Sequence, residues 1–169
     1  MTVGSGTGFD EEAVKRDLAI MEGVEKEDAN KLRQWCEVRG LRDDIEKFPK
    51  DGKPSDLGGL FDKLGDHLYG MGDEIRAEKA YREGTRRALA YAPCYASLAC
   101  ALSCRNDSKG AEIVLRKGIK NFPKDGDLTD LGGLYSLLGE VLDNMGDAIG
   151  AKKVKRDLEA IKKRSQKPK

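Results

Sequence analysis

Three cysteines come closest, by type and spacing, to forming a chemical site. Cys94, Cys100 and Cys104 follow a C-x5-C-x3-C pattern, and the last two, four residues apart, would share one face of a helix. Three thiolates could bind a soft metal or carry out redox chemistry, although a structural zinc site takes four ligands. We expect these residues and Cys36 to be reduced thiols that pack as small hydrophobic side chains, with no metal or cofactor. A thiol-based metal or redox module is the alternative.

Other residues capable of catalysis are few. His67 is the only histidine, and no Ser-His-Asp or Cys-His set accompanies it, so a partly exposed helical position is expected for it. The GSGTG run at residues 4–8 lacks the preceding apolar strand and the following Lys-Ser or Lys-Thr of a phosphate-binding loop. The sequence therefore nominates no catalytic residue, and we expect that the chain is not an enzyme.

The overall charge is balanced, with 31 Lys and Arg against 30 Asp and Glu and a formal net charge of +1. This composition lacks the basic excess typical of nucleic-acid-binding domains. No window approaches the roughly 18 apolar residues of a membrane span, and the first residues lack the basic and apolar regions of a secretory signal. We expect a protein of the cytoplasm or an organellar matrix, in a reducing compartment.

An internal repeat reveals the elements that position these residues. The motif FPKDG-x3-DLGGL begins at Phe48 and again at Phe122, 74 residues later, and 19 of the first 34 positions are identical without a gap. The segment between the copies fits the same pattern, because a shift of 34 from Leu64 reaches Leu98. The third copy is displaced by six extra residues in an Asp125–Asp130 linker. The repeating unit is therefore about 34 residues long.

Each copy is predicted to consist of two antiparallel helices joined by a tight turn. The turns are Gly72-Asp73, Asn106-Asp107 and Gly146-Asp147. Gly or Asn suits the left-handed residue that ends a helix, and Asp suits the N-cap of the next. Small residues recur where the two helices would touch and let their backbones approach closely. They are Gly65, Ala99 and Gly139 on the first helices, and Ala77, Ala111 and Ala151 on the second.

The repeat resembles the tetratricopeptide repeat (TPR) family over residues 58 to about 165. The resemblance rests on the repeat length, the Leu-Gly pair, the small residue of the second helix and the Pro after it, here Pro123. The chain departs from the pattern at Lys155, and at Gly84 and Gly118, where the family favours Ala. The resemblance implies an all-α, right-handed α-solenoid of antiparallel helix hairpins.

The domain organisation follows from this reading. We expect three TPR-like repeats at residues 58–91, 92–125 and 132–165, within a repeat region at residues 48–165. Helical spacing of apolar residues at 10–22 and 29–47 predicts a divergent N-terminal hairpin over residues 10–47, which gives about eight helices. Residues 1–9 are expected to be a flexible tail, and residues 166–169 a basic one.

In this family the first helix of each unit lines a concave face, where an extended peptide or a partner helix usually docks. The resemblance therefore implies a non-catalytic scaffold for protein–protein interaction, an adaptor or accessory subunit of a larger assembly. The residues mapped to that face are Asp62, Asp66, Tyr69, Ser97, Cys100, Ser103, Cys104, Ser136, Glu140, Asp143 and Asn144.

The charge of this face predicts the chemistry of its partner. Chaperone-binding members of the family hold a terminal carboxylate with Lys, Asn and Arg, whereas Asp62 and Asp66 stand where the first Lys and Asn are expected. A carboxylate would be repelled there. We therefore expect no carboxylate clamp for chaperones, and a groove that prefers a basic or amphipathic segment.

The last predicted helix is strongly basic. Its patch consists of Lys152, Lys153, Lys155, Arg156, Lys162, Lys163 and Arg164. Basic residues near a helix C-terminus interact favourably with its dipole, and a terminal repeat needs a polar outer face. Binding of an acidic partner, RNA or anionic lipid through this patch is the other interpretation.

Overall fold

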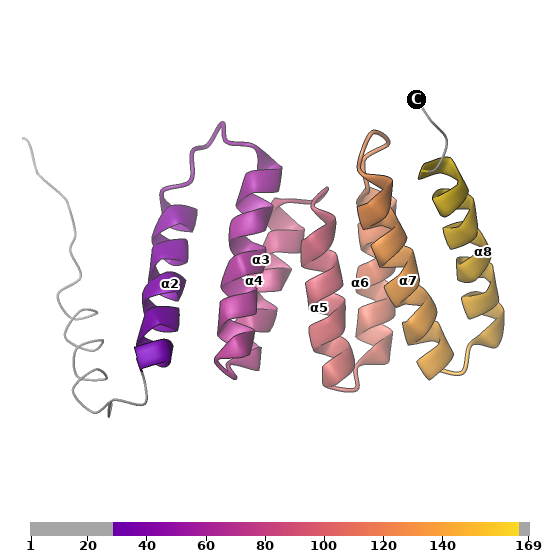
Figure 1. Cartoon of the computed structure of the whole chain (residues 1–169), viewed down its shortest axis with the longest axis horizontal. Coiled ribbons are helices and arrows are strands. Elements are labelled where there is room, and N and C mark those ends of the chain that lie inside the picture. Colours follow the sequence, from indigo (N-terminus) through magenta and orange to yellow (C-terminus); the bar gives the residue numbers. More distant parts are fainter. Residues whose placement is uncertain (1–28, 166–169) are drawn as a thin grey trace, which may run out of the picture. The chain divides into compact units, whose positions relative to one another are not determined.

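The computed structural model describes residues 29–165, and its regular elements there are seven α-helices (Figure 1). They are α2 (Ala29–Glu46), α3 (Pro54–Gly70), α4 (Glu74–Arg87), α5 (Ala92–Cys104), α6 (Ser108–Asn121), α7 (Leu128–Asn144) and α8 (Ala148–Ser165). None of these helices has the length and apolar character needed to cross a membrane. The all-helical prediction is confirmed for this range. The helix expected at residues 10–22 and both predicted tails lie outside the described residues.

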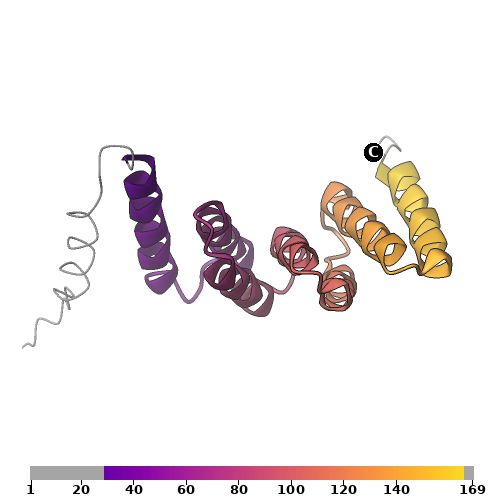
Figure 2. The same cartoon turned by 90° about the horizontal axis from the view of Figure 1, so that it is seen from below.

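The chain from Glu37 onward forms one compact unit, whose boundary falls within α2. In this unit α3 packs with α4, α5 with α6, and α7 with α8, and each pair contacts the next (Figure 1 and Figure 2). The first helices of successive pairs also touch, α3 with α5 and α5 with α7. Because α7 begins at Leu128, residues 128–130 of the predicted linker belong to this helix, which has 17 residues like α3, whereas α5 has 13.

Three turns with the same hydrogen bonds join the helices of each pair. Gly72, Asn106 and Gly146 have positive φ angles of 79°, 63° and 77°. The N–H of the next residue reaches back to the last turn of the preceding helix, as from Asp73 to the Leu68 carbonyl at 2.9 Å. The Asp side chain then accepts a hydrogen bond of 2.8 to 3.0 Å from the N–H three residues on. The turn prediction is confirmed in all three pairs.

The small residues expected at the helix crossings lie in the core. Ala77 and Ala111 are completely buried and Ala151 nearly so. Around them pack the largest fully buried side chains, which are Tyr95, Leu68, Leu98, Leu115, Leu134, Leu138, Leu142, Val38 and Cys94. Burial of each such side chain contributes about 1.5–3 kcal/mol, so hydrophobic packing within and between the pairs is the main source of stability.

Glycines at equivalent positions differ in how tightly they are packed. A Cβ on Gly65 would lie 2.2 Å from the Tyr81 ring, whereas a Cβ on Gly139 would lie 3.7 Å from Val154. The first distance is far below van der Waals contact and the second is ordinary contact. The absence of a side chain is therefore required in the first pair and not in the third.

Two departures from the family pattern have a packing reason. A Cβ on Gly84 would lie 2.3 Å from the Cys94 sulfur, and one on Gly118 would lie 2.8 Å from Tyr95 Cγ. The absence of a side chain at Gly84 and Gly118 leaves room for Cys94 and Tyr95 of α5. Ala at either position would displace a buried neighbour.

We expect Gly65→Ala to destabilise the protein by about 1–3 kcal/mol, as overpacking of a core does. The matched substitution Gly139→Ala should stabilise it by up to about 1 kcal/mol, because Ala favours a helix more than Gly and its Cβ would make only an ordinary contact with Val154. Urea unfolding followed by circular dichroism measures both. Equal effects at the two positions would contradict the tight α3–α4 crossing.

Candidate functional site

Side chains from the first helices of the three pairs meet on one face. We call this the α3/α5/α7 face and define it by residues of those helices that form hydrogen bonds with one another or influence one another's pKa. They are Asp62, Asp66 and Tyr69 of α3, Ser97, Cys100 and Cys104 of α5, and Glu140 of α7. All seven belong to the set predicted from the sequence.

Asp62 joins the first two pairs at this face. Its carboxylate accepts a hydrogen bond of 2.8 Å from the Ser97 hydroxyl on α5. Burial raises the pKa of Asp62, the Ser97 hydrogen bond opposes that shift, and the negative charge of Asp66 adds to it. Ionisation of Asp62 therefore makes the folded protein less stable than it is with this carboxyl protonated.

Asp66 is oriented by a residue of the second helix. The Tyr81 hydroxyl donates a hydrogen bond of 2.7 Å to its carboxylate. Burial raises the pKa of Tyr81, and the hydrogen bond to Asp66 raises it further, so the phenol stays a neutral donor. Sequence reasoning missed Tyr81, because nothing in its spacing from Asp66 indicates a hydrogen bond between helices.

Tyr69 and two thiols form a less polar part of the same face. Tyr69 is 39% exposed. Its pKa is raised, first by a hydrogen bond with Cys104 and also by the Cys104 charge. Cys100 lies close to Cys104 and Glu140, and its pKa is raised mainly by loss of solvation. An exposed aromatic ring beside carboxylates suits contact with a segment that carries both apolar and basic side chains.

The other residues predicted for this face lie at its edge or elsewhere. Ser103 is half-buried on α5, and Ser136 and Asn144 are exposed on α7. Asp143 is also exposed, but its carboxylate pairs with Lys155 of α8 at 2.7 Å. Asp143 therefore takes part in the charged surface of the last pair.

The three cysteines of the C-x5-C-x3-C pattern are not brought together. Cys94 is completely buried, and its thiol donates a hydrogen bond of 3.3 Å to the Gly58 carbonyl. Burial raises its pKa strongly, which disfavours a thiolate. Cys100 and Cys104 are exposed instead. Among residues 29–165 no three His, Cys, Asp or Glu side chains are placed to hold a metal ion.

His67 has an ordinary surface environment. Its Nδ1 lies 3.2 Å from the Glu37 carboxylate, and both side chains are partly exposed to solvent. Such a pair contributes about 0–1 kcal/mol to stability. The partly exposed position expected for His67 is confirmed.

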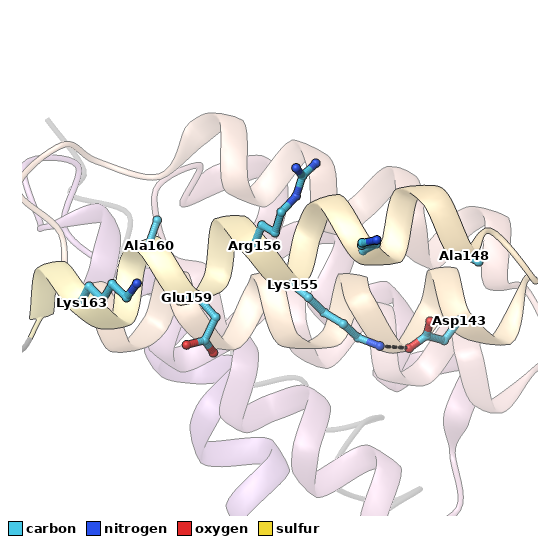
Figure 3. A pocket seen from close by; sticks show the side chains of 8 residues that line it. Asp143, Ala148, Lys155, Arg156, Glu159, Ala160 and Lys163 are labelled. Atoms are coloured by element: carbon cyan, nitrogen blue, oxygen red, sulfur yellow. Dashed lines mark hydrogen bonds and ion pairs between the residues drawn. The ribbon is translucent and has the colours of Figure 1, made fainter.

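Part of the basic patch of α8 lines a hollow. Lys152, Lys155, Arg156 and Lys163 line a hollow of about 630 Å³ together with Asp143 and Glu159 (Figure 3). The other predicted members, Lys153, Lys162 and Arg164, are exposed and do not line the hollow, although Lys162 pairs with Glu159 at 3.0 Å. The last turn of α8 is basic, as its dipole favours.

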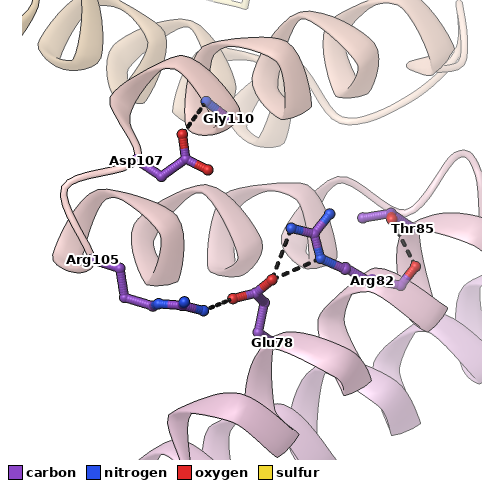
Figure 4. A network of polar contacts seen from close by, with 6 residues as sticks. All are labelled: Glu78, Arg82, Thr85, Arg105, Asp107 and Gly110. Carbon is purple, nitrogen blue, oxygen red and sulfur yellow. Dashed lines mark hydrogen bonds and ion pairs between the residues drawn. The ribbon is translucent and has the colours of Figure 1, made fainter.

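A charged network joins α4 of the first pair to the end of α5 of the second (Figure 4). The Glu78 carboxylate on α4 lies 2.8 Å from the Arg82 guanidinium and also pairs with Arg105, just after α5. This contact supports the α4–α5 packing that places Asp62 beside Ser97. The two arginines are exposed and Glu78 is half-buried, and we assign the network a structural role.

No protein-family model, curated protein or solved structure matched this chain in three comparisons. The TPR resemblance therefore rests on the repeat itself. The chemistry of the α3/α5/α7 face has to be interpreted from its own residues.

At neutral pH, Asp62→Asn is expected to raise the midpoint of thermal unfolding. The raised pKa means that the folded protein binds the Asp62 proton more tightly than the unfolded chain, so ionisation of Asp62 lowers stability as pH rises through the folded pKa. The amide oxygen of Asn can still accept the Ser97 hydroxyl.

Calorimetry between about pH 3 and pH 7 measures this difference, since Asp titrates near the lower limit. The advantage of the variant should vanish at low pH, where wild-type Asp62 is protonated. Asp125→Asn, at an exposed position between α6 and α7, is the control. A lower midpoint for Asp62→Asn at neutral pH would show that its charge stabilises the fold.

Proposed function

We propose that this protein is a non-catalytic interaction scaffold of the TPR type. In this proposal the three helix pairs form a right-handed α-solenoid and act as an adaptor or accessory subunit of a larger assembly. The α3/α5/α7 face binds a basic or amphipathic segment of a partner protein. The observation that carries the proposal is the set of polar side chains from three successive first helices that interact across this face.

The charge of the face supports a basic partner. Its defining residues include the carboxylates of Asp62, Asp66 and Glu140 and no Lys or Arg. Complementary charge speeds encounter and disfavours wrong partners, even where the gain in affinity is small. A terminal carboxylate of the kind bound by chaperone adaptors would be repelled.

The energetics of Asp62 support a functional reason for its charge. A buried carboxylate with a raised pKa lowers stability when it is ionised at neutral pH. Perturbed pKa values concentrate at binding and catalytic sites, where function outweighs stability. A cationic side chain of a partner would compensate the charge of Asp62 and offset that cost.

The regularity of the helix pairs supports the TPR assignment. Each pair has the same turn with a left-handed residue and an Asp cap, and each has small residues at its crossing. A protein built from similar packed pairs stabilises one pair through the next and leaves the outer face of each first helix available for binding.

The test compares two variants of equal charge. Asp62→Asn/Asp66→Asn/Glu140→Gln removes three carboxylates from the face, and its amides still accept the Ser97 and Tyr81 hydrogen bonds. Lys at positions 62 and 66 would break those bonds. Asp51→Asn/Asp125→Asn/Asp157→Asn removes three exposed carboxylates elsewhere.

Each tagged protein is used to capture partners at near-physiological salt, with quantitative mass spectrometry as the readout. Stoichiometric partners should be retained by the wild type and the control, and their affinity for the face variant should fall about tenfold or more. If all three proteins recovered the same amount of partner, the face would be rejected as the binding site. The same conclusion would follow if the control lost as much partner as the face variant.

A further inference from the structure

The outer side of α8 carries a row of side chains at helical spacing, which we call the α8 stripe. Its members are Ala148, Lys152, Lys155, Arg156, Glu159, Ala160 and Lys163. Figure 3 shows them along one side of the helix, with Lys155 reaching the Asp143 carboxylate at the end of α7. The hollow that they line is open to a binding partner.

One position of the stripe distinguishes the third helix pair from the first two. Lys155 occupies the position of Tyr81 in the first pair and Leu115 in the second. Those two side chains are 3% and 0% exposed, and their helices pack against the next pair. Lys155 is exposed and ion-paired with Asp143. This one position, buried in the first two pairs, is therefore charged and exposed in the third.

The length and composition of the stripe point to an extended acidic protein segment. Lys152 and Lys163 are eleven residues apart, which is about 16 Å along a helix, too far for one small anion to contact both. Asp143 and Glu159 pair with Lys155 and Lys162, so the stripe as a whole stays basic. Ala148 and Ala160 offer apolar contact, which a protein segment can use.

The chain itself contains a segment of complementary charge. Residues 10–28 carry eight Asp and Glu against three Lys and Arg, whereas α8 carries seven Lys and Arg against two Asp and Glu. These opposite charges largely cancel in the formal net charge of the whole chain, which is +1. Oppositely charged regions of one sequence can attract each other between copies.

We propose that the α8 stripe binds the acidic segment, residues 10–28, of a second copy of this chain. Such a head-to-tail contact uses different surfaces on the two copies, so each added copy leaves one stripe and one segment unoccupied. Self-association then increases with protein concentration and weakens with salt. The α3/α5/α7 face is not used, so this proposal and the scaffold proposal can fail separately.

Sedimentation velocity of the whole chain over a range of concentrations tests the stripe. Lys152→Glu/Arg156→Glu/Lys163→Glu reverses it and leaves the Lys155–Asp143 ion pair intact. Lys109→Glu/Lys117→Glu/Lys120→Glu makes the same charge change at exposed positions of α6, away from the stripe. We expect the stripe variant to weaken self-association about tenfold or more and the control to leave it near the wild-type value.

A mixing experiment identifies the occupant of the stripe. Glu11→Lys/Glu12→Lys/Glu22→Lys reverses charges in the acidic segment, and this variant alone should also stay monomeric. Mixed with the stripe variant, it should form a heterodimer, because one protein keeps an intact stripe and the other an intact segment. Circular dichroism of each variant confirms that its helices are retained.

Several results would overturn the proposal. A wild type that stays monomeric at all concentrations would do so, as would equal weakening by the stripe variant and its control. The absence of a heterodimer in the mixture would remove residues 10–28 as the occupant. Binding of a monomeric wild type to phosphatidylserine vesicles or to RNA, lost only in the stripe variant, would assign the stripe to those ligands instead.

Discussion

The close approach of α3 and α4 at Gly65 is the contact on which the candidate site depends. Because Gly65 has no side chain, the ring of Tyr81 packs directly against α3. That position brings the Tyr81 hydroxyl within 2.7 Å of the Asp66 carboxylate. One missing side chain in the core thereby orients a charged group on the α3/α5/α7 face. Tyr81 thus connects the packing of α3 against α4 with the orientation of Asp66 on the proposed binding face.

The same arrangement of helices serves different purposes in the three pairs. Tyr81 and Leu115 are buried at equivalent positions, whereas Lys155 is exposed and paired with Asp143. One position of the repeat is thus buried in two pairs and exposed and charged in the third. Acidic side chains gather on the α3/α5/α7 face and basic ones on the α8 stripe, although the total charge is close to zero.

The features that sequence predicted well are those that depend on local chemistry. A left-handed residue followed by an Asp cap has few alternatives, so Gly72, Asn106 and Gly146 identified the turns. Helical spacing also placed Cys100 and Cys104 together. It did not reveal that Cys94 points into the core against Gly84, because that contact joins different helices.

The hydrogen bonds of Asp62 and Asp66 were missed for the same reason. Each joins side chains of different helices, 35 and 15 residues apart in the chain, and depends on how those helices cross. Sequence also mapped Asp143 to the proposed binding face, whereas its ion pair with Lys155 connects it to α8. Residue type and spacing indicated the face, and packing decided which of its members interact.

Titration of the ¹⁵N-labelled protein with a basic amphipathic helical peptide tests the central claim most directly. Our account predicts saturable chemical-shift changes that centre on Asp62, Tyr69, Cys100 and Glu140, with little change along the outer sides of α4 and α6. A sequence-matched peptide with acidic residues in place of the basic ones should cause no such changes. Shifts spread over α4 and α6, or the same response to both peptides, would contradict a binding face formed by α3, α5 and α7.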